Sequence, residues 1–584
     1  MKYREIFLLT LVIACSLVCN FTGIRWGLPG AERTDLVFPE HLRTDEFYAL
    51  MRDTRDDIYR ITEGSPCGYS KTNTQVSPIK QSLGIHNNTD SIVIGSDRRI
   101  LANAIRPYLL KAHHADEQMT ISALSNVKPK KLQFNPRLYH YGGVFIYSTG
   151  AWLGISHVLG LSRITPDLVF YLRNPAEMAR IIVAGRTLGA LAMTLSAVLV
   201  FLIGRRLYST RAGFLASLFF ALSPAVIAQA HIMKPYPMAT FFALACVYAS
   251  TFLDTKKTAV YLACGIAGGL TTGSIYTSWM ILLVPYAFHL LHTRKLIDKN
   301  IVLTAITAIG IFVLTNFYWF SDFSATCFEL SIGKDAYPFK FSLLSVLGFF
   351  KNTMIVALRE GTTLLVILGT LYAFVKKEEQ SIALLVPCIA VYSLYALMIW
   401  NASTSISTGR FLLPCLGILL IITGRAMDAM LANKRAAKIA IGFIAIAILH
   451  TGNYAASYIK NYADDSTTRS TQLQAGRWIM KEIPQGSSIG LFVAPEPYIV
   501  PPFDFSRYQV TIIGDLMALP QAQLPDYLIY VFTPDHMEYI KEHFEKTALF
   551  SPKNPLFTTL KEPEMVNANH SVAVFRKKQK TQHP

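Results

Sequence analysis

A series of apolar segments, each close to the length needed to cross a lipid bilayer, constrains the fold of this chain more than any other feature. The first follows Lys2 and Arg4 and covers about 18 residues, where a membrane-spanning helix needs about 20. We therefore predict an α-helical polytopic membrane protein with about 11 transmembrane helices, its first segment an uncleaved anchor rather than a cleaved signal. The other ten segments lie at roughly 183–204, 212–230, 237–254, 258–275, 277–292, 301–320, 360–375, 381–400, 410–424 and 438–457.

Composition and charge agree with this class. Hydrophobic residues make up 52% of the chain, charged residues 16%, and the net charge is +17. The positive-inside rule places connections rich in Lys and Arg in the cytoplasm, together with the N-terminus. Because topology explains the positive charge, we expect no nucleic-acid partner. The basic residues occupy every second connection: Arg205, Arg206 and Arg211; Lys256 and Lys257; Arg294, Lys295 and Lys299; Lys376 and Lys377; Arg425, Lys434, Arg435 and Lys438.

This topology leaves two large pieces outside the membrane. One further apolar segment, residues 141–161, would invert the orientation if it crossed, so we expect it to lie in the outer interface. A membrane domain, residues 1–457, then carries a first outer loop at about 24–182, and residues 458–584 form a small extracytoplasmic α/β domain. Helices are predicted in that domain at 471–484 and 535–546, and strands within 488–494, 508–514, 526–532 and 570–577.

Two groups of residues could form a disulfide or a metal site, and each also has a simpler interpretation. Cys67 and Cys327 fall in predicted outer loops and could form a disulfide, whereas the other six cysteines lie in apolar segments. The stretch KAHHADEQ, residues 111–118, could hold a metal ion through its histidines and acids. Adjacent histidines point apart on a helix, so a solvated helix face is the favoured interpretation for this stretch.

The stretch RTDEFYAL, residues 43–50, places Asp45 and Glu46 side by side in the first outer loop. Adjacent carboxylates in a loop usually point into solvent, which is one interpretation. The other is a general base above a membrane-bound substrate, with a pKa tuned by desolvation and by the neighbouring acid.

Basic and aromatic residues gather on four other outer connections. Cations at that depth can extend to lipid head groups, or together they can bind the phosphate of a lipid substrate. These residues are Arg137, Tyr139, His140 and Tyr141, then Arg186, then His231 and Lys234, and finally Arg410.

Motifs in a fixed order carry a resemblance to a known family. RTDEFYAL is followed by NPRLYHYGGVFIY, by GRTLGALAMTLSAVLVFLIGRRLYS and by HIMKPYPMATFFALACVY, and the tail holds RSTQLQAGRWIMKEIPQGSSIG. This order resembles the bacterial polyprenyl-phosphate-dependent glycosyltransferases of the GT-C superfamily, near the protein mannosyltransferases of glycosyltransferase family 39 and the lipid A aminoarabinose transferases. The resemblance covers nearly the whole chain, although each motif alone is only moderately specific.

The resemblance implies an enzyme of the inner (plasma) membrane that transfers a sugar, with inversion, from a polyprenyl-phosphate donor to an acceptor hydroxyl at the outer face. The acceptor would be a protein, a lipid or a polysaccharide. By the same resemblance, Asp45 is the base and Glu46 a helper or metal ligand. Cations that stabilise the leaving phosphate lower the barrier. The donor-phosphate candidates are Arg186, Lys234 and Arg410, and the further substrate-binding candidates are Arg43, Tyr139, His140, His231 and Tyr236.

The chain also departs from the family pattern. Tyr236 stands where many relatives carry an Asp, and Ser274 where relatives often carry a Lys. A divalent metal is possible, and these departures leave its ligands, Glu46 included, unknown. A catalytically degenerate scaffold is therefore an alternative to the enzyme. A lipid or sugar transporter is a third hypothesis, for which charged or Gly/Pro-broken spans and an inverted repeat would be expected.

Overall fold

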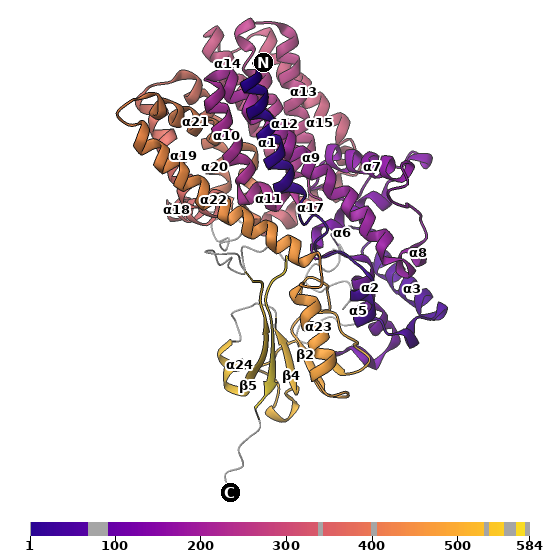
Figure 1. Cartoon of the computed structure of the whole chain (residues 1–584). Coiled ribbons are helices and arrows are strands. Elements are labelled where there is room, and N and C mark those ends of the chain that lie inside the picture. Colours follow the sequence, from indigo (N-terminus) through magenta and orange to yellow (C-terminus); the bar gives the residue numbers. More distant parts are fainter. Residues whose placement is uncertain are drawn as a thin grey trace.

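The computed structural model describes residues 2–67, 91–336, 343–398, 406–530, 537–553 and 568–578. Figure 1 shows two parts: a bundle of helices that holds the N-terminus at its far end, and a β-sheet with covering helices at the opposite end. We call that end the sheet side of the bundle. The segment between α1 and α9, residues 22–174, is called the long loop, and its described residues, 22–67 and 91–174, also lie on the sheet side.

Seven helices among the described residues are long and apolar enough to cross a membrane, or eight if one bent pair counts as a span. The pair is α10 (Thr210–Leu222) and α11 (Pro224–Ala230), which bend by 58°. The seven spans are built on α1 (Tyr3–Phe21), α9 (Pro175–Leu207), α12 (Tyr236–Ser250), α19 (Ile355–Val375), α20 (Glu379–Met398), α21 (Leu413–Ala432) and α22 (Ala437–Asp465).

The remaining predicted spans form shorter helices: α13 (Thr258–Ser274), α14 (Leu283–Thr293) and α15 (Lys299–Thr315). The 3-10 helix η5 (Tyr276–Leu282) precedes α14, and it forms the first part of the span predicted at 277–292. The polytopic helical class is thus confirmed, while the number eleven stays a prediction. The segment predicted to lie in the interface forms α7 (Gly143–Val158), which is not among the candidate spans. Shorter helices follow α15 at α16 (Tyr318–Ser321), α17 (Phe323–Ala336) and α18 (Leu343–Phe349).

The bundle packs through small residues and buried polar contacts. A Cβ atom added at Gly213 of α10 would overlap the backbone of α9 at Phe201, so a glycine permits this close approach. Asn20 donates to Ser16 and to Thr194, which links α1 to α9 inside the bundle. At the end away from the sheet, the basic connections pair with acids of neighbouring helices, as in Arg211–Asp428 and Arg425–Glu378.

The sheet has six strands in the order β1-β3-β2-β4-β6-β5. The central strands β3, β2 and β4 are parallel, and β1, β6 and β5 pair antiparallel. Each of the four predicted strands is confirmed, and so is the first predicted helix of this part, α23 (Thr471–Glu482). The second, predicted at 535–546, is present as α24 (Met537–His543), but residues 544–546 belong to a strand. The strands are β1 (Ile92–Val93), β2 (Ser488–Leu491), β3 (Gln509–Ile512), β4 (Tyr527–Tyr530), β5 (Phe544–Phe550) and β6 (Val572–Lys577).

The long loop packs into the sheet part instead of standing apart from it. It contributes β1, and its helices share one hydrophobic core with α23 and the strands. The Tyr108 hydroxyl donates to the Val500 carbonyl at 2.9 Å, and Lys111 pairs with Glu496 at 2.6 Å. A domain boundary at 457/458 stays a prediction, since both sides contribute to this core. Besides α7, the described α-helices of the long loop are α2 (Ala31–Val37), α3 (Asp45–Ile61), α5 (Arg98–Leu110), α6 (Ala115–Asn126) and α8 (Leu168–Arg173).

Candidate functional site

The acids of KAHHADEQ lie in the first turn of α6, directly on the bundle. The interpretation of this stretch as a solvated helix face is wrong, because His113, His114 and Glu117 are buried. The two histidines precede the helix, and the extended backbone of His114 (φ −123°, ψ 112°) directs their rings to different partners. His113 contacts Asp465 at 2.9 Å, while His114 Nδ1 accepts the N–H of Asp116 as the N-cap.

Glu117 and Arg186 form a fully buried, two-pronged ion pair that holds α6 against α9. Nε and Nη2 of Arg186 each lie 2.7 Å from a carboxylate oxygen of Glu117. Nη1 of Arg186 donates to the carbonyls of Ile24 and Trp26, and the guanidinium stacks over the Trp26 ring. Because these partners engage all three nitrogens of Arg186, the geometry favours a structural role over the predicted contact with a donor phosphate.

Asp116 forms an ion pair with Lys234 beside this structural pair. Lys234 lies in the turn between α11 and α12, and its side chain is only 2% exposed, compared with 31% for Asp116. The N–H of Met233 donates to Glu117 at 3.0 Å, which fixes the turn to the start of α6. The Tyr141 hydroxyl donates to Asp116 at 3.4 Å from the segment before α7. Three separate segments therefore meet at the Asp116 carboxylate: α6, the turn between α11 and α12, and the segment before α7.

Arg410 adds a second cation to this site. It lies in η7 (Ile406–Leu412), just before α21, and its guanidinium lies over the rings of Tyr236 at 5.5 Å and Phe411 at 4.8 Å. Its charge acts on both Asp116 and Lys234. The structure therefore brings together three of the predicted residues, Lys234, Arg410 and Tyr236, around an acid that sequence reasoning had assigned to solvent.

Burial and mutual charge set the ionisation of this site. Burial acts to raise the pKa of Asp116, but the charge and hydrogen bond of Lys234, helped by the charge of Arg410, outweigh it and lower that pKa, so the carboxylate is ionised. Burial, helped by the charge of Arg410, lowers the pKa of Lys234 to about 8 despite the nearby Asp116. Burial also lowers the pKa of His114 well below its usual value, which keeps this ring neutral. The result is an anion between cations at the sheet side of the bundle.

Asp45 and Glu46, the predicted catalytic pair, lie at the first turn of α3 on the surface of the long loop. Their side chains are 89% and 78% exposed and pair with Arg173 and Arg98. The neighbouring Thr44 is the N-cap of α3, so the two acids sit where helix starts favour negative charge. This placement explains the acid pair by local helix chemistry and gives it no contact with the phosphate-binding candidates among the described hydrogen bonds and ion pairs.

The other predicted substrate-binding residues have internal partners. Arg43 pairs with Asp35 at 2.6 Å. His231 contacts the carbonyls of Ile227 and Thr22 and stacks on Tyr462, and burial lowers its pKa to about 4. Tyr139 and His140 contact two acids that the sequence interpretation did not single out: the Tyr139 hydroxyl donates to Asp322, and His140 contacts Glu329. Cys67 and Cys327 are both free thiols, so the suggested disulfide is absent from the structure.

A cavity of about 820 Å³ opens next to the turn of α9 that carries Arg186. Its walls come from α2, α7 and α9 and from the segment that joins α22 to α23. Apolar side chains such as Trp152, Ile155 and Val183 line it together with the cations Arg25 and Arg180. The lining also holds the acids Glu32 and Asp465, so the charges of the cavity do not select one kind of ligand.

The apolar helices and the sheet part define the class of this chain, a multi-pass membrane protein. Within that class, residues 179–319 match the family model described as dolichyl-phosphate-mannose-protein mannosyltransferase. The match confirms the resemblance to the GT-C superfamily over the segment that it covers, which holds Arg186 and Lys234. A comparison with curated proteins finds no match.

Several solved structures have a remote likeness to this one. ArnT from Cupriavidus metallidurans bound to undecaprenyl phosphate has a TM-score of 0.42 at 13% identity, over 79% of this chain and 92% of that one. The oligosaccharyltransferase AglB from Archaeoglobus fulgidus, in complex with an inhibitory peptide and a dolichol-phosphate, has a TM-score of 0.39 at 11% identity, over 87% and 64%. An Archaeoglobus fulgidus oligosaccharyltransferase complex with Zn and sulfate has a TM-score of 0.36 at 12% identity, and the chain spans about half of its length, 51%.

Proposed function

We propose that this protein is an integral membrane glycosyltransferase that moves a sugar, with inversion, from a polyprenyl-phosphate donor to an acceptor hydroxyl. The reaction takes place at the sheet side of the bundle, which the positive-inside rule assigns to the outer face of the membrane. The family match over residues 179–319 supports a prenyl-phosphate sugar as the class of donor. The observation that carries the proposal is the buried Lys234 beside the ionised Asp116 and close to Arg410.

Lys234 and Arg410 bind the donor phosphate in this proposal. A glycosyl phosphate ester leaves as a lipid phosphate with an added negative charge. Cations that are already in place stabilise that charge more strongly in the transition state than in the ground state. The burial of Lys234 strengthens the attraction, since surrounding water screens a buried charge less.

Asp116 is the proposed base that orients the acceptor hydroxyl and accepts its proton. In the free protein Lys234 holds the pKa of Asp116 low, which makes the carboxylate a weak base. A donor phosphate competes for Lys234, and the loss of that partner raises the pKa of Asp116 towards a more useful value. Donor binding would thus prepare the base, while the 31% exposure of the Asp116 side chain leaves the acceptor a way in.

Glu117 and Arg186 serve this site as a support. Their ion pair fixes the start of α6, and Glu117 also holds the turn that carries Lys234 through the N–H of Met233. Asp116 and Lys234 are therefore held at a set separation by neighbours that do not touch the substrate, as a preorganised site requires.

Transfer of a radiolabelled sugar tests this function. Purified protein is incubated with polyprenyl-phosphate sugars and membrane extract, and the labelled product identifies the acceptor class. We expect Lys234→Met to lower transfer by roughly a hundredfold, the usual effect of removing one group that stabilises a developing charge. Lys481→Met is the matched control, because the Lys481 side chain is 82% exposed on α23. No transfer by the wild type, or equal transfer by both variants, would contradict the proposal.

A further inference from the structure

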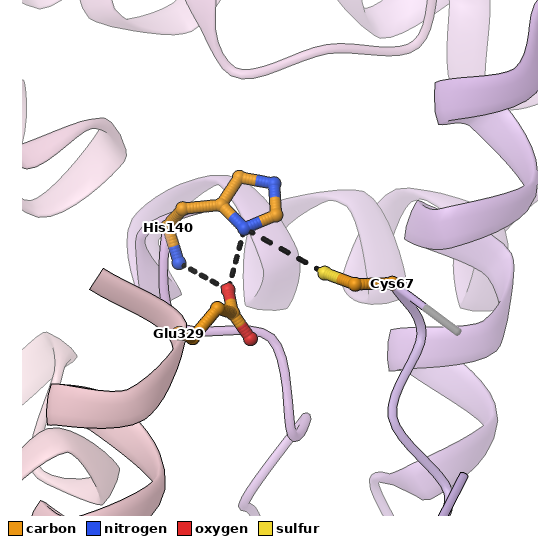
Figure 2. A group of neighbouring side chains, drawn as sticks. All are labelled: Cys67, His140 and Glu329. Carbon is orange, nitrogen blue, oxygen red and sulfur yellow. Dashed lines mark hydrogen bonds and ion pairs between the residues drawn. The ribbon is translucent and has the colours of Figure 1, made fainter. Parts of the chain in front are cut away.

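Three potential metal ligands from distant segments meet on the sheet side of the bundle. Cys67 follows α3 in the long loop, His140 precedes α7, and Glu329 lies on α17. One ligand atom from each of the three lies within 4.8 Å of the other two. Figure 2 shows the sulfur and the carboxylate facing the same side of the imidazole ring.

Both neighbours of His140 contact the same ring nitrogen, Nδ1. The Sγ of Cys67 lies 3.8 Å from it, and Oε1 of Glu329 lies 2.5 Å from it. A cysteine nucleophile activated by a His–Glu pair needs the thiol and the carboxylate on opposite ring nitrogens, because one takes the proton while the other orients the ring. Convergence of sulfur, nitrogen and oxygen on one point is instead the arrangement of a shared cation.

The spacing of these atoms fits a small cation after a modest movement. Metal–ligand bonds of about 2.0–2.3 Å in a tetrahedral centre put ligand atoms roughly 3.4–3.6 Å apart. The Sγ–Nδ1 distance of 3.8 Å is already close to that value. The Nδ1–Oε1 distance of 2.5 Å is shorter than that value, so an ion bound by both atoms would increase their separation by about 1 Å.

Backbone hydrogen bonds fix the direction of the Glu329 carboxylate, as hydrogen bonds to metal ligands do in many metal sites. Oε1 of Glu329 also accepts the backbone N–H groups of Tyr139, at 2.8 Å, and of His140, at 2.9 Å. The Glu329 side chain is only 9% exposed, so its charge has little water around it and requires compensation. Such neighbouring hydrogen bonds commonly fix the direction of a ligating group.

The ligand types select the ion. Magnesium and calcium take oxygen ligands almost exclusively, whereas a set with one thiolate, one imidazole and one carboxylate suits zinc. Three protein ligands leave a fourth position for water. We propose that Cys67, His140 and Glu329 bind one zinc ion that ties two segments of the long loop, one after α3 and one before α7, to α17.

This ion would support the candidate site without taking part in it. His140 is adjacent to Tyr141, whose hydroxyl donates to Asp116. A clamp on His140 therefore holds in place one of the partners of that carboxylate. The proposal does not depend on the glycosyltransferase function, because it rests on three other residues and is tested by metal binding.

Metal binding by the full chain tests this proposal. Protein purified in detergent is stripped with a chelator and titrated with Zn²⁺, and bound metal is measured by mass spectrometry. Co²⁺ is used in parallel, since a cobalt–thiolate bond gives a charge-transfer absorption that other ligands lack. We expect one zinc per wild-type chain, and an absorption that Cys67→Ser abolishes. The matched control is Cys327→Ser, because Cys327 is an exposed thiol on the same helix as Glu329 and should leave both readouts unchanged.

A second variant separates ligation from folding. Glu329→Gln keeps an oxygen that can accept the N–H groups of Tyr139 and His140 but removes the anionic ligand. We expect this variant to lower zinc affinity by at least about tenfold. Losing a hydrogen-bond partner of a metal ligand already costs that much, and this variant changes a ligand itself. The proposal is overturned if the wild type binds less than stoichiometric zinc, if the cobalt absorption survives in Cys67→Ser, or if Glu329→Gln binds zinc like the wild type.

Discussion

Asp116 and Lys234 form an ion pair in which the ammonium group is almost completely buried while the carboxylate stays about one-third exposed. The partners come from α6 in the long loop and from the turn between α11 and α12 in the bundle. Their contact joins the long loop to the sheet side of the bundle. The proposed reaction depends on this contact, and so do the predictions for Lys234 and Asp116.

The binding of a lipid phosphate should depend on pH through Lys234. Lys234 carries its positive charge below its pKa of about 8 and loses that charge above it. Affinity for undecaprenyl phosphate should therefore fall as pH rises through about 8, by up to about tenfold per pH unit above that value. Lys234→Arg keeps its charge over this range, so its affinity should change much less. Titration calorimetry at a series of pH values makes the comparison, and parallel curves for both proteins would exclude Lys234 as the titrating group.

The Glu117–Arg186 pair should be essential to stability. Glu117→Gln leaves the fully buried Arg186 without its anionic partner, and we expect it to lower the free energy of unfolding by about 3–5 kcal/mol. Glu46→Gln breaks an exposed pair with Arg98 and should change that free energy by about 0.5 kcal/mol or less. Chemical denaturation in detergent micelles measures both variants. A Glu117→Gln protein as stable as Glu46→Gln would mean that other contacts hold α6.

The start of α7 should tolerate no side chain at Gly143. A Cβ atom there would overlap the carbonyl oxygen of Thr315 on α15, whereas one at Gly154, on the same helix, would meet no atom within 4 Å. We expect Gly143→Ala to cost about 1–3 kcal/mol through overpacking. Gly154→Ala should be neutral or add up to about 1 kcal/mol, since alanine favours helix. Thermal unfolding of the two variants gives the answer, and equal melting temperatures would show that α7 packs differently from the structure.

Much of the fold follows from patterns that local sequence carries. Apolar length predicts the helices of the bundle, and short apolar runs predict β2, β3, β4 and β6. β1 escapes such patterns because it has only two residues and pairs with β3, far along the chain. β5 escapes them because its sequence, FEKTALF, continues the charged stretch of α24 without the alternation expected of a strand.

The site could be predicted only in part, because burial of an acid depends on contacts distant in sequence. Of the three adjacent acid pairs in the long loop, the one at 56–57 lies inside α3, whereas those at 45–46 and 116–117 stand at the start of a helix. Periodicity cannot say which pair faces the bundle. One signal distinguishes these two pairs: the second directly follows two histidines, which are buried more often than arginine, whereas Arg43 lies two residues before the first. Lys234 and Arg410 were found from their positions at the ends of apolar segments, since charges there are rare in spans.

The most direct test of the central claim compares two asparagine variants under single-turnover conditions with saturating donor. Asp116→Asn and Asp45→Asn each remove one carboxylate, and both proteins are first matched for folding by thermal unfolding. We predict that Asp116→Asn lowers the rate of sugar transfer by roughly a hundredfold or more, as expected of a lost general base. Asp45→Asn, whose side chain is 89% exposed, should transfer at close to the wild-type rate. The opposite pattern, with Asp45→Asn inactive and Asp116→Asn active, would contradict the account and return the catalytic role to the surface of the long loop.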